Sequence, residues 1–227
     1  MVGRRAAFYP VTTWPGWQPH PRAGQPIPAE WWARPATEVA RALLGARLVR
    51  RWPDGITLAG VILEAEAYGP EDDQGCHCRA GRTRRTQGLY GPPGHAYVYF
   101  TYGMHWLFNV VTFPDGVPGA VLVRALWPTE DSPAWRARVA GRPWARALDG
   151  PAKLCRALAI DGRFYGHDVT DPRSELYLLF DGQFADEAVT QSPRVGLNTV
   201  PEPWRSIPWR WRVRPPRMGG QRGPRSA

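Results

Sequence analysis

Three consecutive segments between residues 95 and 127 constrain the fold of this chain more than any other feature. Each is dense in β-branched and aromatic residues, and their sequences are HAYVYFTYG, MHWLFNVVTF and GAVLVRALW. The first two follow each other directly around Gly103, and Pro114-Asp115-Gly116 separates the second from the third. Connections this short join neighbouring antiparallel strands, whereas parallel strands need a long crossover. The segment therefore predicts an antiparallel sheet.

The elements around this sheet predict an α+β fold in one domain over residues 36–213. A further hairpin is expected from residues 46–52 and 56–68, with its turn at Pro53-Asp54-Gly55. Helical patterns cover 37–45, with Thr37 as N-cap, and also 133–147 and 151–160. Short strands are expected at 175–180 and 208–213. Residues 69–94 carry nine glycines and prolines and read as a long irregular loop, which in a compact domain is usually functional.

Two terminal segments differ in composition from the domain. Residues 1–35 contain seven prolines and no helical or strand period, so we expect an extended arm. Four tryptophans in this arm could pack it against the domain: Trp14, Trp17, Trp31 and Trp32. Residues 214–227 (RPPRMGGQRGPRSA) are basic and rich in proline and glycine, and we expect a disordered tail.

The charge distribution indicates a polyanionic partner. Lysine and arginine number 29 against 20 acidic residues, which gives a formal net charge of +9. Seven arginines and no acidic residue lie between Arg205 and Ala227. A second cluster without acidic residues lies in the 69–94 loop and comprises Arg79, Arg82, Arg84 and Arg85. Nucleic acid is the first candidate for such surfaces, although a solvated loop and a frayed tail would read the same way.

Several classes of protein are disfavoured by the sequence. No apolar run approaches the ~18 residues that span a bilayer. The arginines near the N-terminus are followed by Pro10, Pro15 and Pro19 instead of the apolar stretch of a signal peptide. Three cysteines, an odd number, argue against a disulfide scaffold. We therefore expect a soluble intracellular protein with no membrane partner.

Glu64, Glu66 and Tyr68 alternate with apolar or small residues at the end of an expected strand. A period of two places these three side chains on one face of the strand. Polar groups at the exit of an apolar strand, just before a glycine-rich loop, indicate a site. Two readings compete with this: an exposed sheet face with paired charges, and the carboxylate pair of a carbohydrate hydrolase.

A Cys76-His77-Cys78 run lies in the loop, but we expect no metal there. Successive residues of an extended chain point to alternate sides, and a structural zinc site needs four ligands. Cys155 is the only other cysteine, so His77 is free to act through hydrogen bonds.

Tyr97 and Tyr99 should share one face of their strand, while Tyr102 stands at the turn before Gly103. Aromatic rings near arginines can stack on nucleobases. A tyrosine-rich core strand, or a nucleic-acid-binding module without catalysis, would also account for this stretch.

These segments together resemble the alkyladenine (3-methyladenine) DNA glycosylase family. The motifs, in order, are EAEAYGPED, His77, GPPGHAYVYFTYGMHWLFNVV, VLVRALWP and GPAKLCRALAI, over roughly residues 36–166. PRVGLN and WRWRV extend the similarity weakly to about residue 213. The resemblance implies a curved antiparallel sheet flanked by helices, without a helix-hairpin-helix. It also implies hydrolytic removal of alkylated or deaminated purines from double-stranded DNA in base excision repair, without strand cleavage.

The resemblance assigns a role to each motif residue. Glu66 matches the general base that activates water, and Arg124 matches a residue that helps to hold that water or nearby DNA. The walls that enclose the flipped base correspond to Tyr68, His77 and Tyr99. Tyr102 matches the side chain that replaces the extruded nucleotide, and Asn109 matches the residue that excludes guanine. Asp72-Asp73-Gln74-Gly75-Cys76 departs from the small residues that are common before the histidine.

The expected partner is duplex DNA with damaged purines, its phosphates held by the arginines of the 69–94 loop. We expect no cofactor, because one carboxylate suffices to activate water. We also expect the enzyme to be a monomer. Its expected location is the bacterial cytoplasm with the nucleoid, or another intracellular compartment that holds DNA.

Overall fold

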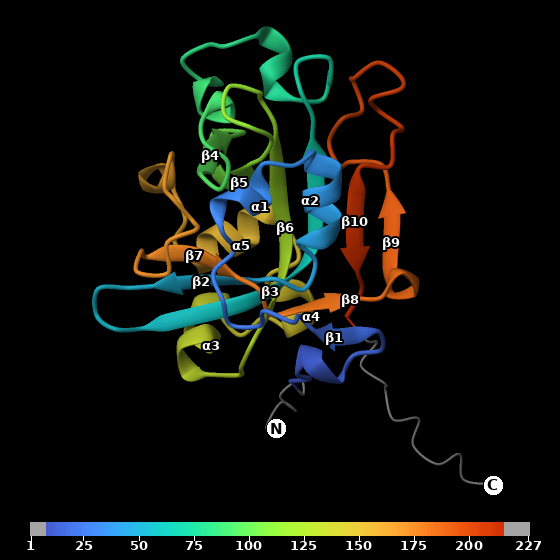
Figure 1. Cartoon of the computed structure of the whole chain (residues 1–227). Helices are drawn as coiled ribbons and strands as arrows, with labels where there is room; N and C mark the ends of the chain where they lie inside the picture. The colour runs from blue at the N-terminus through green and yellow to red at the C-terminus, as the bar shows by residue number, and fades with distance from the viewer. Residues whose placement is uncertain (1–7, 216–227) are drawn as a thin grey trace, which may run out of the picture.

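The computed structural model describes residues 8–215, and a curved antiparallel sheet organises them (Figure 1). The strands are β1 (Trp17–Pro19), β2 (Arg47–Arg51), β3 (Thr57–Tyr68), β4 (Ala96–Thr101), β5 (His105–Val111), β6 (Ala120–Pro128), β7 (Leu176–Leu179), β8 (Gly182–Phe184), β9 (Val189–Ser192) and β10 (Arg210–Val213). The helices are α1 (Ala29–Trp32), α2 (Ala36–Ala42), α3 (Pro133–Val139), α4 (Trp144–Ala147) and α5 (Pro151–Ala157). The expected α+β class is confirmed.

The long strand β3 lies at the centre of the sheet and bends along its length (Figure 1). The order is β4-β5-β6-β3-β10-β9, and β2 pairs with the first half of β3 and with β7. The register of β3 against β6 shifts on both sides of Glu64. Such irregularities bend a strand and increase its twist. The first half of β3 therefore pairs with β2, whereas its second half pairs with β10.

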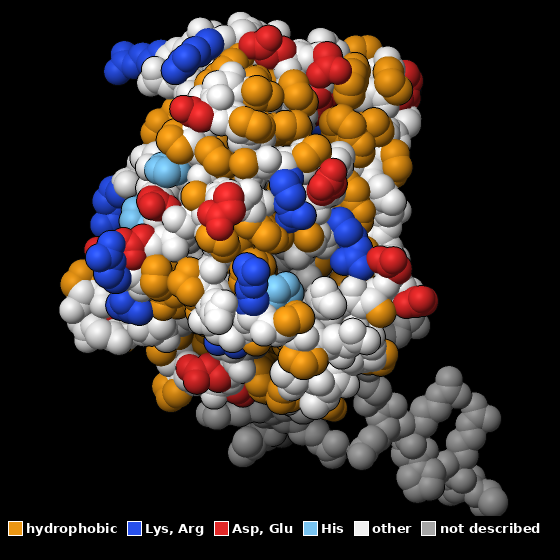
Figure 2. All heavy atoms as spheres, in the orientation of Figure 1, with side chains coloured by type: hydrophobic (Ala, Val, Ile, Leu, Met, Phe, Trp, Pro, Cys, Tyr) orange, Lys and Arg blue, Asp and Glu red, His pale blue; other side chains and the backbone are white. Residues whose placement is uncertain are grey.

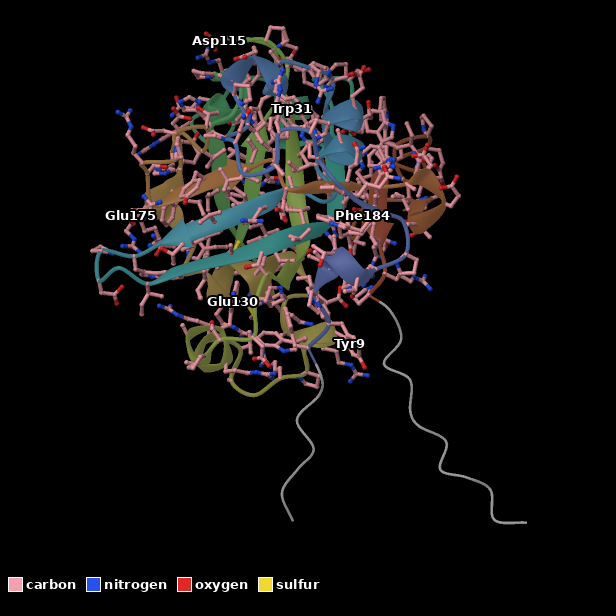
Figure 3. All side chains as sticks on the ribbon, turned by 60° about the horizontal axis from the view of Figure 1, so that its bottom comes forward. Tyr9, Trp31, Asp115, Glu130, Glu175 and Phe184 are labelled. Atoms are coloured by element: carbon pink, nitrogen blue, oxygen red, sulfur yellow. The ribbon has the colours of Figure 1, made fainter. Side chains whose placement is uncertain are left out.

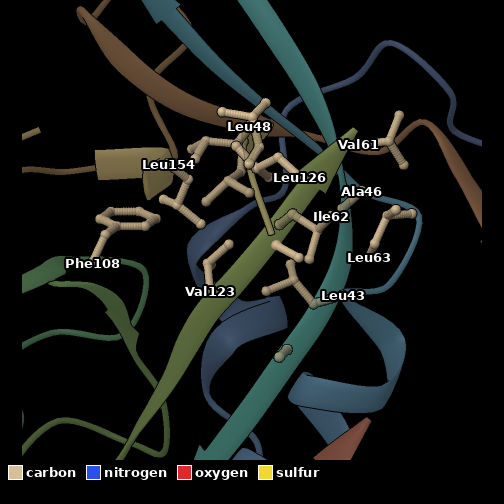
Figure 4. Packing of buried hydrophobic residues seen from close by; sticks show 14 of the residues in the cluster. Leu43, Ala46, Leu48, Val61, Ile62, Leu63, Phe108, Val123, Leu126 and Leu154 are labelled. Atoms are coloured by element: carbon tan, nitrogen blue, oxygen red, sulfur yellow. The ribbon is translucent and has the colours of Figure 1, made fainter. Parts of the chain in front are cut away.

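Strict alternation of side chains gives the sheet two different faces. On one face lie apolar residues of the main core, among them Ala65, Val98, Phe108 and Val123. Leu43, beside α2, and Leu154 of α5 pack against this face (Figure 4). The neighbouring positions on the other face carry most of the polar and aromatic residues of these strands, with Leu107, Ala120 and Leu122 among them, and line a pocket. Because successive side chains of a strand point to opposite faces, the same strands place core residues on one face and pocket residues on the other.

Residues 8–35 lie against the domain. β1 pairs with β8, and the ring centroids of Trp17 and Phe184 are 5.1 Å apart (Figure 3). Trp14 and Trp32 are buried, and the backbone N–H of Ile27 donates to the carbonyl of Leu178 over 3.1 Å. The expected tail over 214–227 lies outside the described residues, except for its first two.

Some expected boundaries were wrong. The helix expected over 133–147 is two helices, because Ala140 and Gly141 adopt positive φ and Pro143 follows. α2 begins at Ala36, so Pro35 and not Thr37 precedes it. α5 ends at Ala157, three residues early. Among residues 8–215, no helix is both long and apolar enough to cross a membrane.

Candidate active site

A cavity of about 350 Å³ opens on the polar face of the sheet. Four strands contribute alternate residues to it: Tyr68 from β3, Tyr97, Tyr99 and Thr101 from β4, His105, Leu107 and Asn109 from β5, and Ala120, Leu122 and Arg124 from β6. Its wall is completed by Gly75–His77, by Pro151 and Ala152 at the start of α5, and by the Val195–Leu197 loop. The residues expected to bind a base therefore gather around one cavity.

The carboxylate of Glu66 lies beneath this cavity with no exposed surface. Its Oε2 accepts hydrogen bonds from the Tyr68 hydroxyl at 2.9 Å and from Arg124 Nη1 at 3.2 Å. Its Oε1 accepts from the backbone N–H of Val195 at 2.7 Å. Burial raises the pKa of Glu66 above its ordinary value, while Arg124, the Val195 N–H and the Tyr68 hydroxyl oppose that rise. Three of the roughly four acceptor positions of the carboxylate are therefore taken by protein groups.

Glu64 lies on the same face of β3, but its carboxylate is paired with three arginine side chains. Its oxygens contact Arg124 Nε at 2.8 Å, Arg210 Nη1 at 3.3 Å and Arg212 Nε at 3.3 Å. Both of its oxygens are therefore taken by side chains of β6 and β10. The carbohydrate-hydrolase reading, which needs both glutamates as acting groups, loses its second carboxylate.

Aromatic rings form the wall opposite Glu66. The His77 and Tyr99 ring centroids are 4.6 Å apart at a steep angle, and those of Tyr97 and Tyr99 are 5.6 Å apart. Tyr97 and Tyr99 share one face, as expected. Burial raises the pKa of Tyr99 to about 12, so its phenol is uncharged at neutral pH. The rings therefore offer neutral, electron-rich surfaces to a planar ligand.

His77 is neutral at physiological pH. Burial, with Arg85 and Arg79 nearby, lowers its pKa to about 4. Its Nδ1 lies 3.0 Å from the Tyr97 hydroxyl, and Arg85 Nη2 lies 3.5 Å from its Nε2. An arginine can only donate, so this contact favours the tautomer with the proton on Nδ1.

Asn109 is buried in β5, where its side chain Nδ2 donates to the carbonyl of Tyr97 over 3.0 Å. Because a carbonyl only accepts, this bond fixes which end of the amide is the nitrogen. The amide cannot rotate freely to suit a ligand. It is a rigid polar feature of the pocket wall, as a discriminating residue requires.

Tyr102 projects from the hairpin between β4 and β5 and is 81% exposed. Tyr102 and Gly103 have φ values of 51° and 66°, and Met104 N–H donates to Thr101 O over 3.1 Å. Two central residues with positive φ define a tight hairpin turn that favours asparagine and glycine. A tyrosine in this conformation is strained by about 1–2 kcal/mol. Strain at an exposed aromatic side chain is typical of a functional position.

The four loop arginines Arg79, Arg82, Arg84 and Arg85 are all exposed. Arg85 lies over the ring of Tyr99 at 5.9 Å, and Arg82 over that of Tyr90 at 5.6 Å. Figure 2 shows basic side chains at the upper left edge of the molecule, near the segment 69–94 of Figure 1. Arg85 therefore lies beside the pocket, and the other three follow in the same exposed loop.

An ion pair that the sequence did not predict ties two loops behind the pocket. Arg194 and Asp73 are fully buried and make two hydrogen bonds of 2.5 and 2.8 Å. Arg194 also donates to the carbonyls of Ala67 and Trp204. Its guanidinium lies over the ring of Tyr68 at 4.8 Å. Because Val195 follows directly, this pair fixes the backbone N–H that binds Glu66.

The sequence could not reveal the role of Val195, because its backbone N–H and not its side chain contacts Glu66. The PRVGLN segment marked this loop only as part of the similarity. Asp73 belongs to the stretch where the sequence departs from the small residues that are common before the histidine. Its burial with Arg194 explains why a charged residue occurs there.

Cys76 and Cys78 are free thiols on either side of His77, and their sulfurs are 2.7 Å apart. Burial and the hydrogen bond to Cys76 raise the pKa of Cys78. Over residues 8–215, histidine, cysteine and acidic residues form no group of three that could hold a metal ion.

Comparisons with known proteins agree with this geometry. The family model described as methylpurine-DNA glycosylase matches residues 30–216. A protein of Carboxydothermus hydrogenoformans named "Putative 3-methyladenine DNA glycosylase" is 43% identical over 172 residues, which cover 76% of this chain and 88% of the relative. A protein of the same name from Salinibacter ruber is 43% identical over 199 residues, with 83% and 93% covered. A third, from Methanocella arvoryzae, is 42% identical over 184 residues, with 79% and 90% covered. The chain therefore belongs to the methylpurine-DNA glycosylase family.

Proposed function

We propose that this DNA glycosylase removes alkylated or deaminated purines from duplex DNA by hydrolysis and leaves an intact abasic site. 3-Methyladenine is the first expected substrate, and hypoxanthine and ethenoadenine are further candidates. The observation that carries the proposal is the buried carboxylate of Glu66, bound by Tyr68, Arg124 and Val195 beneath an aromatic pocket.

The target base must leave the helix to reach this carboxylate. Flipping costs a few kcal/mol of unstacking, and a ring inserted into the gap offsets part of that cost. Tyr102 is the candidate, because it is exposed at the tip of the hairpin beside the pocket. The exposed loop arginines would hold phosphates on either side of the extruded nucleotide.

The flipped purine would stack between Tyr68, His77 and Tyr99. An N-alkylated purine carries positive charge, which favours electron-rich rings and makes the base a good leaving group. Glu66 then orients a water molecule and takes its proton as the sugar becomes oxocarbenium-like. The hydroxyl joins the sugar carbon, and the purine departs with the electron pair of the glycosidic bond. The rigid amide of Asn109 would oppose an unmodified guanine.

Hydrolysis, not strand cleavage, is expected from the amines available. A strand-cutting glycosylase attacks the sugar with an amine and forms a Schiff base. The chain has a single lysine, Lys153, and its Nζ donates to the carbonyl of Arg146 over 3.2 Å. We further propose that the enzyme acts as a monomer on DNA inside the cell.

The test is a panel of duplexes, each with one lesion, incubated with wild type and with Glu66→Gln. Wild type should release base and leave strands that break only on alkaline treatment. Glu66→Gln keeps the shape but cannot accept a proton, so release should fall by at least a hundredfold while binding persists. Asp149→Asn, outside the pocket, is the control. Release by Glu66→Gln at the wild-type rate would refute Glu66 as the base, and inactivity of wild type on every lesion would refute the substrate class.

A further inference from the structure

Glu64 is a buried carboxylate for which the proposed chemistry has no use. It is 3% exposed and lies two residues before Glu66 on the same face of β3. Arg124 reaches it from β6, while Arg210 and Arg212 reach it from β10. The register shift at Glu64 is the irregular point of the β3–β6 ladder. A buried charge without partners is costly, and the three arginines offset that cost for Glu64. Because the proposed reaction uses Glu66 and not Glu64 as the base, the role of Glu64 lies in the groups that it holds.

The three arginines depend on Glu64 to different degrees. Arg210 has a second partner in the Ser192 hydroxyl at 3.0 Å, and Arg212 has one in Asp149 at 2.8 Å. Among the described residues, the side-chain hydrogen bonds of Arg124 go to Glu64 and Glu66 alone. Removal of Glu64 would therefore leave the other two arginines with a second partner each, whereas Arg124 would lose the bond that holds its Nε and keep only the longer contact with Glu66.

The geometry of Arg124 joins the two glutamates. A guanidinium is planar and presents its N–H groups in a fixed fork. Its Nε is held by Glu64 at 2.8 Å, and its Nη1 then falls 3.2 Å from Glu66 Oε2. With Nε fixed, the plane of the group is fixed as well, and so is the direction from which Nη1 approaches Glu66.

We propose that Glu64 is a positioning residue for the excision reaction, which holds the guanidinium of Arg124 against the general base Glu66. The inference rests on the proposed function, because it assigns Glu64 a part in the same reaction. Glu64 acts through Arg124, and its loss should change the protonation of Glu66 as well as the rate.

Glu64 affects the pKa of Glu66 in two ways with opposite signs: directly through its own charge, and indirectly through the guanidinium of Arg124 that it holds. The charge of Glu64 raises that pKa, whereas Arg124 lowers it and is the stronger of the two. The groups around Glu66 are Arg124 on β6, Tyr99 on β4, Tyr68 and Glu64 on β3, Arg210 opposite it on β10, and Val195 with Arg194 in the loop after β9. A merely neighbouring charge and a positioning residue therefore predict opposite shifts.

The experiment measures single-turnover excision from a hypoxanthine or 3-methyladenine duplex between pH 5 and 9. Glu64→Ala should release Arg124, lower the plateau rate at least tenfold and move the acid limb to higher pH. Glu64→Gln can still accept from Arg124 Nε, so it should restore much of the rate. Asp149→Asn, which removes a partner of Arg212 only, should match wild type.

An acid limb that moves to lower pH with an unchanged plateau would overturn the inference, since Glu64 would then be only a nearby charge. Equal rates in all variants would overturn it as well. If Glu64→Ala does not fold, Glu64→Met decides, because it fills a similar volume without an acceptor for Arg124 Nε: a limb above that of wild type supports positioning, and one at or below it does not. Failure of wild type to excise any lesion would refute the proposed function instead.

Discussion

Glu66 is held where burial and hydrogen bonding act on its pKa in opposite directions. Burial prevails, so its pKa lies above the ordinary carboxyl value. A general base works best when its pKa approaches the working pH, provided that it remains mostly ionised. The bonds from Arg124 and Val195 keep the rise in check and fix the direction of the carboxylate.

The pH dependence of excision should report Glu66 and not His77. The base is active when ionised, so the rate should fall as pH drops through a pKa above 4.5. His77, with a pKa of about 4, stays neutral throughout that range. His77→Gln should therefore lower the rate through weaker stacking but leave the acid limb at the same pH. A limb that disappears in His77→Gln would show that the histidine titrates instead.

Residue-scale prediction from sequence succeeded where a side chain carries the signal. The alternation of Glu64, Glu66 and Tyr68 predicted one face, and the face exists. It could not show that Glu64 binds arginines from β6 and β10, because partners across a sheet depend on register. Nor could it reveal Val195, since any residue supplies the same N–H. The family roles of Tyr102 and Asn109 remain predictions.

At the scale of elements, the hairpin between β4 and β5 is the part of the site that reaches out. Tyr102 is held outward by its own backbone, with positive φ on a two-residue turn. Phe100 and Met104 flank it and are also exposed. Exposed apolar side chains that lie together are typical of a surface that a binding partner covers.

Tyr102→Asn should impair flipping and leave stability intact. Asparagine tolerates positive φ, and the ring is exposed, so the melting temperature should not fall. Loss of a stacking ring, worth ~1–3 kcal/mol, should lower single-turnover excision roughly ten- to a hundredfold. Tyr102→Phe should retain the activity. A smaller loss is expected when the lesion is mispaired, because that base costs less to unstack.

A large drop in Tm for Tyr102→Asn, with equal loss on paired and mispaired lesions, would contradict a role as a wedge. The ring would then support the hairpin itself.

The elements that the sequence missed or misplaced have local causes. β8 and β9 are three and four residues long, too short for a periodic signal to mark them. The break between α3 and α4 follows from the left-handed backbone at Ala140, a conformation that is uncommon for alanine. Long strands with clear alternation, by contrast, were placed within a few residues.

At the scale of the whole molecule, positive charge should set the salt dependence of DNA binding. Deletion of residues 216–227 removes Arg217, Arg222 and Arg225. If each meets one phosphate, the slope of log K against log salt should fall by up to about 2.7. Affinity should drop alike for all sequences. Removal of Ser226 and Ala227 alone is the control, and an unchanged slope in the longer deletion would show that this segment does not meet DNA.

The pairing of β1 with β8 has a consequence for how the chain reaches its native state. Trp17 and Phe184 are opposite each other although nearly the whole chain separates them in sequence. Closing so long a loop carries a large entropic cost, and contacts of this kind form late and slowly. During synthesis, residues 17–19 are made long before their partners at 182–184. Trp14 and Ile27, which are buried in the folded protein, therefore reach their final packing only after β7 and β8 have been made.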